Sequence, residues 1–197
     1  MNDYQKILKF VKNHNSLITI EEFKQQDISY YFINKLIEDG IIRRADKGIY
    51  IKTDSFEDIY FIIQNKFKKS IFSYNTALYL LGETEVTPNF IEISVPRSYH
   101  IKDYGNQVIP HYISDDNYKL GAIKIKSVFG NEVVVYNLER TICDIVKNGG
   151  TLDKEQINKI IRKSFLSYKI NGERLLKYAK SLKCEKKIKA IMEVMIW

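Results

Sequence analysis

The sequence predicts an α+β protein: an N-terminal winged helix-turn-helix followed by a mixed α/β C-terminal domain that ends in basic helices. Three observations support this fold class. Residues 1–52 contain three helix-like segments and then a short hairpin pattern, residues 53–149 mix helical and strand patterns, and residues 150–197 have helical periodicity with many lysines. We therefore expect two domains, at residues 1–52 and 53–197.

Composition limits the class of protein. The chain has 197 residues, and 45% of them are hydrophobic, which is enough for one large domain or two small ones. The N-terminus lacks the apolar region of a signal peptide, and no apolar run reaches the length of a membrane span. Cys143 and Cys184 are too few for a disulfide framework or a zinc site. We expect a cytoplasmic protein with no membrane contact, no cofactor and no metal.

The sequence contains boundary signals for three helices in residues 1–40. Apolar residues recur at helical spacing over residues 3–13. Thr19 and Glu22 form a capping-box pattern, which predicts a second helix to about Gln26. A third helix is expected over residues 30–39, with Ser29 as its N-cap and Gly40 as its stop.

A polar turn over residues 45–48 separates two β-prone runs, Ile41–Arg44 and Ile49–Ile51. Three helices followed by a basic hairpin is the order of a winged helix-turn-helix, whose third helix enters the major groove of DNA. The candidate DNA-binding residues are Ser29, Tyr30, Tyr31, Asn34, Lys35, Arg43, Arg44 and Lys47. They are also compatible with an ordinary solvated surface or with a winged helix that binds protein.

The middle of the chain predicts an α/β body without a recognisable catalytic motif. Expected helices cover residues 56–67 (capped by Ser55, with Ile59 buried), 73–81 and 138–148 (capped by Asn137), and expected strands cover 90–95, 108–112, 123–128 and 132–136. His100 and His111 lie near Asp103, Asp115 and Asp116 in sequence, which favours surface pairs over a catalytic dyad. Arg140 and Asp144 are spaced for an i,i+4 ion pair. We expect no enzyme activity.

Positive charge is concentrated at the C-terminal end. Residues 1–52 have a net charge of +2, residues 53–147 of −2, and residues 148–197 of +7. Asp153 or Thr151 caps one expected helix, and Asn171 precedes the next. A candidate basic patch on these helices comprises Lys154, Lys159, Arg162, Lys163, Arg174 and Lys177. The alternatives are a solvated lysine-rich face and a surface for a phosphate-rich or acidic partner. Lys186, Lys187 and Lys189 begin the last helix, where the helix dipole disfavours cations.

Four motifs occur in an order that is typical of one family. They are Gly48-Ile49-Tyr50, the Ser73-x-x-Thr76-Ala77-Leu78-x-x-Leu81-Gly82 pattern, Ile91–Pro96 (IEISVP) and Leu138–Asp144 (LERTICD). Together they resemble the AbiEi-type antitoxins of bacterial abortive-infection systems, which are type IV toxin–antitoxin systems of phage defence. The resemblance implies that the winged helix binds inverted repeats of double-stranded DNA in its own promoter and represses the operon. It also implies that the C-terminal domain counters a nucleotidyltransferase-like toxin without needing a stable complex.

Two other functions remain open from the sequence. One is a ligand-responsive winged-helix transcriptional regulator without an antitoxin role, and the other is an enzyme that a winged helix targets to nucleic acid. The first predicts a mostly apolar pocket in the α/β domain, and the second predicts metal-dependent chemistry. An inverted repeat would bring two copies to DNA, but no dimer helix is evident, so a monomer that binds DNA cooperatively is one expected arrangement.

Overall fold

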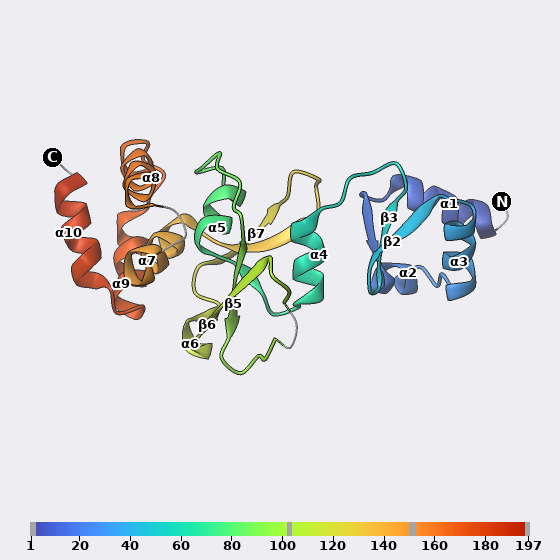
Figure 1. Cartoon of the computed structure of the whole chain (residues 1–197), viewed down its shortest axis with the longest axis horizontal. Coiled ribbons are helices and arrows are strands. Elements are labelled where there is room, and N and C mark those ends of the chain that lie inside the picture. The colour runs from blue at the N-terminus through green and yellow to red at the C-terminus, as the bar shows by residue number, and fades with distance from the viewer. Residues whose placement is uncertain (1–2, 102–103, 150–152, 196–197) are drawn as a thin grey trace. The chain divides into compact units, whose positions relative to one another are not determined.

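The structure is a computed structural model that describes residues 3–101, 104–149 and 153–195, and Figure 1 shows its elements. It contains two compact units. Unit 1 comprises Met1–Lys68 and Lys126–Val133, and unit 2 comprises Lys69–Ile125 and Val134–Trp197. Unit 1 thus reaches beyond residue 52, and the division of function after that residue stays a prediction.

Unit 1 begins with the predicted three helices and hairpin. Its elements are α1 (Asp3–Asn13), β1 (Leu17–Thr19), α2 (Ile20–Gln25), α3 (Tyr30–Glu38), β2 (Ile42–Asp46) and β3 (Ile49–Lys52). The strands form an antiparallel sheet of order β1-β3-β2, in which β3 pairs with both neighbours. The three helices lie around this sheet in Figure 1, which is the arrangement of a winged helix-turn-helix.

The buried faces of these elements form one small core. Phe23 of α2 and Ile33 and Leu36 of α3 are fully buried, and they pack with Ile7 and Val11 of α1. The capping box at the start of α2 is formed as predicted, since Glu22 N donates to Thr19 Oγ1 at 3.3 Å and Thr19 N donates to Glu22 Oε2 at 2.7 Å. The core and the cap together hold α2 and α3 in fixed positions.

The fourth helix, α4, begins later than the sequence predicted. It covers Ile59–Lys66, and its N-cap is Asp58 rather than Ser55. Asp58 is completely buried, and it accepts hydrogen bonds from Phe61 N at 3.2 Å, from Ser127 Oγ and from Asn131 Nδ2 at 2.9 Å. Because these distant partners bind the Asp58 carboxylate, Asp58 rather than Ser55 caps the helix. Ile59, which we expected to be buried, is 40% exposed.

Unit 2 is a mixed five-stranded sheet with helices. Its elements are β4 (Ile71–Phe72), α5 (Tyr74–Leu80), β5 (Ile91–Pro96), β6 (Val108–Ile113), α6 (Asp115–Tyr118), β7 (Ala122–Lys126), β8 (Glu132–Tyr136), α7 (Leu138–Asn148), α8 (Lys154–Leu166), α9 (Gly172–Ser181) and α10 (Glu185–Met195). The strand order is β6-β5-β4-β8-β7. The sequence analysis missed β4 and α6. The predicted α+β class is confirmed in its coarse outline.

The strand β4 is short but central. It pairs antiparallel with β5 and parallel with β8, through Phe72 opposite Val135. Two residues are too few for a strand periodicity, so no local pattern revealed it. The strand predicted over residues 123–128 ends at Lys126, because Ser127 turns to Asp58.

The C-terminal helices share one apolar core with α5 and α7. Ile142 of α7, Ile161 of α8, Leu175 of α9 and Ile188 of α10 are all buried in it. Asp153 caps α8 by accepting from Gln156 N at 2.8 Å, and Asn171 caps α9 by accepting from Arg174 N at 2.9 Å. The alternative α8 cap, Thr151, and the carboxylate of Asp103 lie outside the described residues.

Arg140 and Asp144 form the predicted ion pair in the core of unit 2. Both are almost fully buried, with Arg140 Nε 2.9 Å from Asp144 Oδ2. The Arg140 guanidinium lies 4.1 Å from the Tyr136 ring centroid. Arg140 Nη1 also donates to the carbonyl oxygens of Asn117 and Leu120, each at 2.7 Å. Gly121, at φ 80°, passes so close that an added Cβ would lie 2.6 Å from Arg140 Cβ.

The expected surface pairing of His111 with an aspartate is wrong. His111 Nε2 lies 3.2 Å from Oε1 of Glu92, which is 1% exposed, and its ring stacks on Tyr74 at 4.0 Å between centroids. Parallel pairing of β5 with β6 brings these residues together. The contact is therefore part of the packing between the sheet and α5.

Candidate nucleic-acid interface

The third helix presents polar and aromatic side chains at its N-terminal end. Tyr30 is 60% exposed and Tyr31 is 70% exposed, and Asn34 is also exposed. Within residues 3–101, 104–149 and 153–195, none of these three side chains makes a hydrogen bond. Their donors and acceptors are therefore available to an outside partner, while Ile33 and Leu36 anchor the opposite face in the core.

Ser29 lies at the start of the same helix. It is exposed at the N-cap position of α3, but its hydroxyl makes no capping hydrogen bond. Helix N-termini and free hydroxyls are common contacts to DNA phosphates. Ser29 therefore lies at the N-terminal end of α3 with its hydroxyl unused as a cap, and its contact with DNA stays a prediction.

Lys35 is less available than the sequence suggested. Its Nζ lies 4.6 Å from the centroid of the Tyr4 ring, and the residue is half-buried. The Tyr4 ring also stacks near Phe32, at 6.3 Å between centroids, and the Tyr4 hydroxyl donates to the Asp39 carboxylate. Helical periodicity within residues 3–13 gives no sign of these contacts between Tyr4 and α3, so they could not be predicted from the sequence.

The hairpin β2–β3 carries the other candidates. Gly48, at φ 73°, forms its tip, and an added Cβ would lie 3.1 Å from Ile20 Cγ2. Arg43 Nη1 lies 2.7 Å from Glu57 Oε1, and Arg44 Nε donates to the Asp46 carbonyl at 3.4 Å. Lys47 is exposed at the tip, and no side-chain bond holds it in the part of the chain that the structure describes. Lys47 is thus the freest cation of the hairpin.

A charged pair, His14 and Glu22, links the segment after α1 to α2. His14 Nε2 lies 3.2 Å from Glu22 Oε1, and Lys52 Nζ donates to the His14 carbonyl at 2.7 Å. The Glu22 hydrogen bond raises the pKa of His14 above its ordinary value. Burial acts to raise the pKa of Glu22, but hydrogen bonds from His14 and Thr19 outweigh it and lower that pKa to about 2.

The pair makes the stability of unit 1 depend on pH. The contribution of Glu22 is present above its ordinary pKa of 4.5 and is lost as the pH falls toward 2. The contribution of His14 is present below its ordinary pKa of 6.5 and is lost as the pH rises through its raised folded value. The pair therefore stabilises unit 1 most between these two ordinary values.

Glu22→Gln is expected to destabilise unit 1 most near pH 5.5, by about 1 kcal/mol or less because solvent screens a partly exposed pair. The substitution keeps a capping-box side chain and removes only the charge. Urea unfolding followed by NMR signals of residues 17–25 would measure it. The deficit should shrink as the pH rises through the raised pKa of folded His14, because the imidazole is then neutral in both states. A deficit that stays constant across this titration would contradict the assignment.

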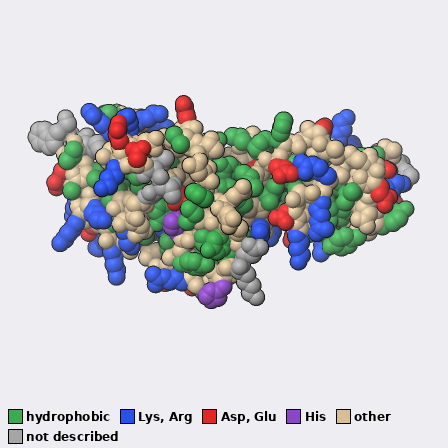
Figure 2. Space-filling model, in the orientation of Figure 1, with side chains coloured by type: hydrophobic (Ala, Val, Ile, Leu, Met, Phe, Trp, Pro, Cys, Tyr) green, Lys and Arg blue, Asp and Glu red, His purple; other side chains and the backbone are tan. Residues whose placement is uncertain are grey.

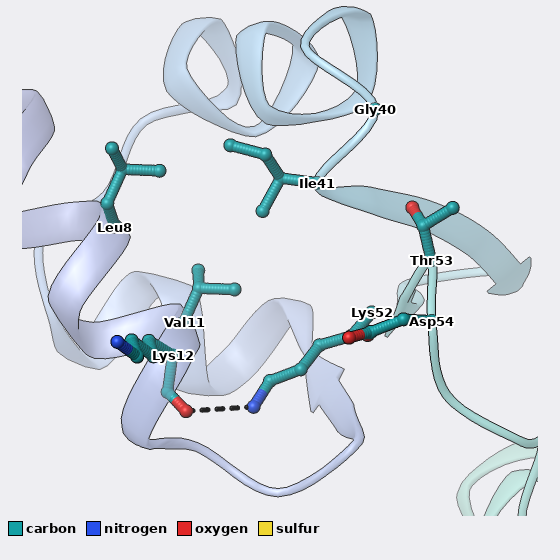
Figure 3. Close-up of a pocket in the computed structure, with 8 residues that line it drawn as sticks. All are labelled: Leu8, Val11, Lys12, Gly40, Ile41, Lys52, Thr53 and Asp54. Carbon is teal, nitrogen blue, oxygen red and sulfur yellow. Dashed lines mark hydrogen bonds between the residues drawn. The ribbon is translucent and has the colours of Figure 1, made fainter.

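Unit 1 also contains a pocket of about 720 Å3, shown in Figure 3. Its lining residues are Leu8, Val11, Lys12, Gly40, Ile41, Lys52, Thr53 and Asp54. The side chains of Leu8, Val11 and Ile41 face one another across it, and Lys52 Nζ donates to the Lys12 carbonyl at 3.0 Å. The volume is within the range of small-molecule sites. The sequence analysis expected such a pocket only in the α/β domain.

The basic patch that the sequence predicted, and that the resemblance makes a candidate antitoxin surface, is divided between two helices. Lys154, Lys159, Arg162 and Lys163 are all exposed on α8, and the last three line one shallow depression. Lys159 Nζ lies 2.8 Å from Glu155 Oε1, but this pair is highly exposed. Figure 2 shows Lys and Arg side chains gathered over the C-terminal helices. The structure thus brings the α8 members together.

The other two members lie on α9. Arg174 Nη2 lies 2.6 Å from Oε1 of Glu139, which is 1% exposed and also accepts from Asn171 N at 2.9 Å. This hydrogen bond raises the pKa of Arg174. Arg174 therefore neutralises a buried carboxylate, whereas Lys177 is exposed. Their role in an antitoxin surface stays a prediction.

Residues 5–51 match a family model. The family is described as the AbiEi antitoxin transcriptional regulators. The match to the AbiEi antitoxin model extends from α1 to β3 and so includes every candidate DNA-binding residue. It confirms the resemblance drawn from the sequence over this segment. The three downstream motifs lie outside the matched AbiEi segment. No curated protein sequence matches the chain.

Two further observations concern the described residues alone. None of their helices is long and apolar enough to cross a membrane. None of their His, Cys, Asp and Glu side chains form a group of three or more that could hold a metal ion. Neither observation identifies a partner for unit 2.

Proposed function

We propose that this protein is an antitoxin and a transcriptional autorepressor that binds inverted repeats in its own operon promoter. Unit 1 is the DNA-binding part, and unit 2 counteracts a nucleotidyltransferase-like toxin in the cytoplasm, without requiring a stable complex and without catalysis of its own. The observation that carries the proposal is the uncommitted polar end of α3, in a segment that matches a family of antitoxin regulators. The hydroxyls of Tyr30 and Tyr31 and the Asn34 amide make no hydrogen bond among the described residues, although the Tyr31 ring packs edge-on against Phe32.

The proposed DNA complex uses each group according to its chemistry. The N-terminal end of α3 enters the major groove, where the Asn34 amide can contact an adenine edge with two hydrogen bonds. Ser29, Tyr30 and Tyr31 contact phosphates that flank this position. Lys47 at the hairpin tip adds a cation, and Arg43 takes part through the donors that Glu57 leaves unused.

Binding of the full chain to its upstream promoter tests the repressor half. Fluorescence anisotropy should give a lower Kd for that promoter DNA than for a shuffled sequence of equal length at physiological salt. Specific regulators discriminate by about 1000-fold or more. Equal affinity for the two sequences would overturn this half of the proposal.

Lys47→Ala is expected to weaken binding to promoter and shuffled DNA alike, since a lysine on phosphate carries no sequence information. The slope of log K against log salt should become smaller by about 1. Lys9→Ala, which removes the same charge from α1, is the control and should leave the slope unchanged. A selective loss on promoter DNA would instead assign Lys47 to a base edge.

The antitoxin half is best tested by substitution rather than by truncation. Removing residues 1–52 would expose Ile62 of α4, which packs against Leu17, Ile49 and Ile51. Tyr31→Ala/Asn34→Ala should abolish repression and still protect cells from the toxin of the neighbouring gene. Lys159→Glu/Arg162→Glu/Lys163→Glu should do the reverse. Unchanged protection by this triple variant would remove the α8 surface from the antitoxic mechanism.

A second candidate function is a ligand-responsive winged-helix regulator without an antitoxin role. The pocket of Figure 3 favours it, because Gly40 and Ile41 of its lining come just after Asp39, the C-cap of α3. A ligand there would contact the segment that leads out of the helix proposed to read DNA. Thermal stabilisation by a metabolite, abolished in Ile41→Trp and accompanied by a change in promoter affinity, would favour this candidate.

A further inference from the structure

Five lysines line a single pocket in unit 2; four of them lie in three helices, and Lys183 lies in the loop between α9 and α10. The pocket has a volume of about 490 Å3 and is lined by Lys147, Lys180, Lys183, Cys184, Glu185, Lys186 and Lys187. Lys147 lies in the last turn of α7, Lys180 in the last turn of α9, and Lys186 and Lys187 in the first turn of α10. None of these lysines belongs to the patch predicted from the sequence.

Only part of this charge has a structural explanation. Lys187 Nζ donates to the carbonyl oxygens of Val146 and Lys147, each at 3.3 Å, and so satisfies the C-terminal end of α7. Two helix C-termini together offset about one elementary charge. The negative C-terminal end of the α9 dipole attracts Lys180, in the last turn of that helix, and Lys183, just after it. Lys186 instead lies in the first turn of α10, where the positive end of the helix dipole repels a cation.

Carboxylates offset only part of the remainder, since Glu185 attracts Lys180 and the buried Asp144 attracts Lys147 without a direct ion pair. Glu185 is the acidic residue of the lining, and its Oε1 pairs with Lys189 Nζ at 2.8 Å, outside the pocket. Among the residues that the structure describes, Lys147, Lys180, Lys183 and Lys186 have no side-chain ion pair or hydrogen bond. Four ammonium groups around one concave space repel one another. Their repulsion is relieved when an anion with several charges binds between them.

We propose that this pocket binds a chain of linked phosphates, either the triphosphate of a free nucleotide or a run of backbone phosphates of a nucleic acid. Phosphate chains place several negative charges within a few ångströms, and lysines bind phosphate as mobile point charges. The volume is within the range of ligand sites. This proposal does not depend on the operator binding of unit 1, because all lining residues belong to unit 2.

The chain offers a matched control. Lys180 and Lys186 line the pocket, whereas Lys159 and Lys163 line the separate depression on α8. All four are exposed, so replacing them should leave the fold intact, as thermal unfolding of each variant would check. Lys180→Gln/Lys186→Gln and Lys159→Gln/Lys163→Gln remove the same charge from the same unit.

Isothermal titration of the full chain, at an ionic strength of about 0.15 M, would use sodium triphosphate, ATP, a single-stranded oligonucleotide and citrate as titrants. We expect saturable binding of at least one phosphate titrant, tighter than that of citrate. Lys180→Gln/Lys186→Gln should weaken it about tenfold or more, since it removes two charge-assisted contacts to phosphate. The α8 control should change the affinity by less than about twofold.

The titrants also distinguish the two sources of phosphate. Binding of triphosphate and ATP supports a free nucleotide, and binding of the oligonucleotide alone supports a nucleic-acid backbone. Absence of saturable binding by all phosphate titrants would overturn the proposal. So would an equal loss in the two double variants, which would mean that the total charge rather than the pocket attracts the anion. Citrate binding as tight as triphosphate binding would exclude phosphate recognition.

Discussion

Arg140→Met is expected to lower the free energy of unfolding of unit 2 by about 3–5 kcal/mol, the largest effect of any single substitution considered. The guanidinium is fully buried and pairs with Asp144, and it also donates to two backbone carbonyls at 2.7 Å. Removing it leaves a buried carboxylate without its partner and takes a donor from both carbonyls, of which Asn117 O keeps the hydrogen bond from Leu120 N. Methionine fills much of the same volume, so the loss reports polar contacts rather than a cavity.

Urea unfolding at two pH values would measure this effect. Burial raises the pKa of Asp144 and Arg140 opposes that rise, so the carboxyl should take up a proton more readily without Arg140. A group with a raised folded pKa binds more protons in the folded state, and the deficit of Arg140→Met should therefore shrink as the pH falls. Arg140→Met/Asp144→Leu, which removes both charges, should recover much of the stability. A deficit below about 1 kcal/mol would show that the pair contributes little.

Asn34→Ala is expected to weaken binding to the operator by about 1–3 kcal/mol while leaving binding to shuffled DNA nearly unchanged. Asn34 is exposed on α3 beside Tyr30 and Tyr31, and its amide has the two groups needed for an adenine edge. Alanine is a good helix former, so α3 itself should not be weakened. The measurement is the ratio of the two Kd values by fluorescence anisotropy.

The control is Gln25→Ala, which removes an exposed amide from α2. It should affect both DNA sequences alike, because the helix before the reading helix contacts the DNA backbone. An unchanged affinity ratio in Asn34→Ala would place α3 outside the major groove. DNA reading would then have to be sought in the hairpin.

Local signals were sufficient wherever a residue and its partner are close in sequence. Thr19 and Glu22 cap α2, and Asn137, Asp153 and Asn171 each accept the hydrogen bond that starts their helix. These contacts span three residues, and so does the pattern that reveals them. The same holds for the i,i+4 pair of Arg140 and Asp144, although its depth in the core was not evident.

Long-range contacts account for the differences. Asp58 replaced Ser55 as a helix cap because Ser127 and Asn131, about 70 positions later, reach its carboxylate. The strand β4 is visible only from its pairing with β5 and β8. His111 met Glu92 rather than a neighbouring aspartate because two strands run side by side. No window of a few residues contains these partners.

The candidate sites follow the same division. Three properties could be predicted from neighbouring residues alone: the order of three helices and a hairpin, the polar end of α3, and the excess of lysine after residue 148. Only the packing of distant segments shows which cations are held in ion pairs, namely Arg43 with Glu57 and Arg174 with Glu139. It also decided which lysines share a pocket, since Lys147 and Lys186 are brought together only by the packing of α7 against α10.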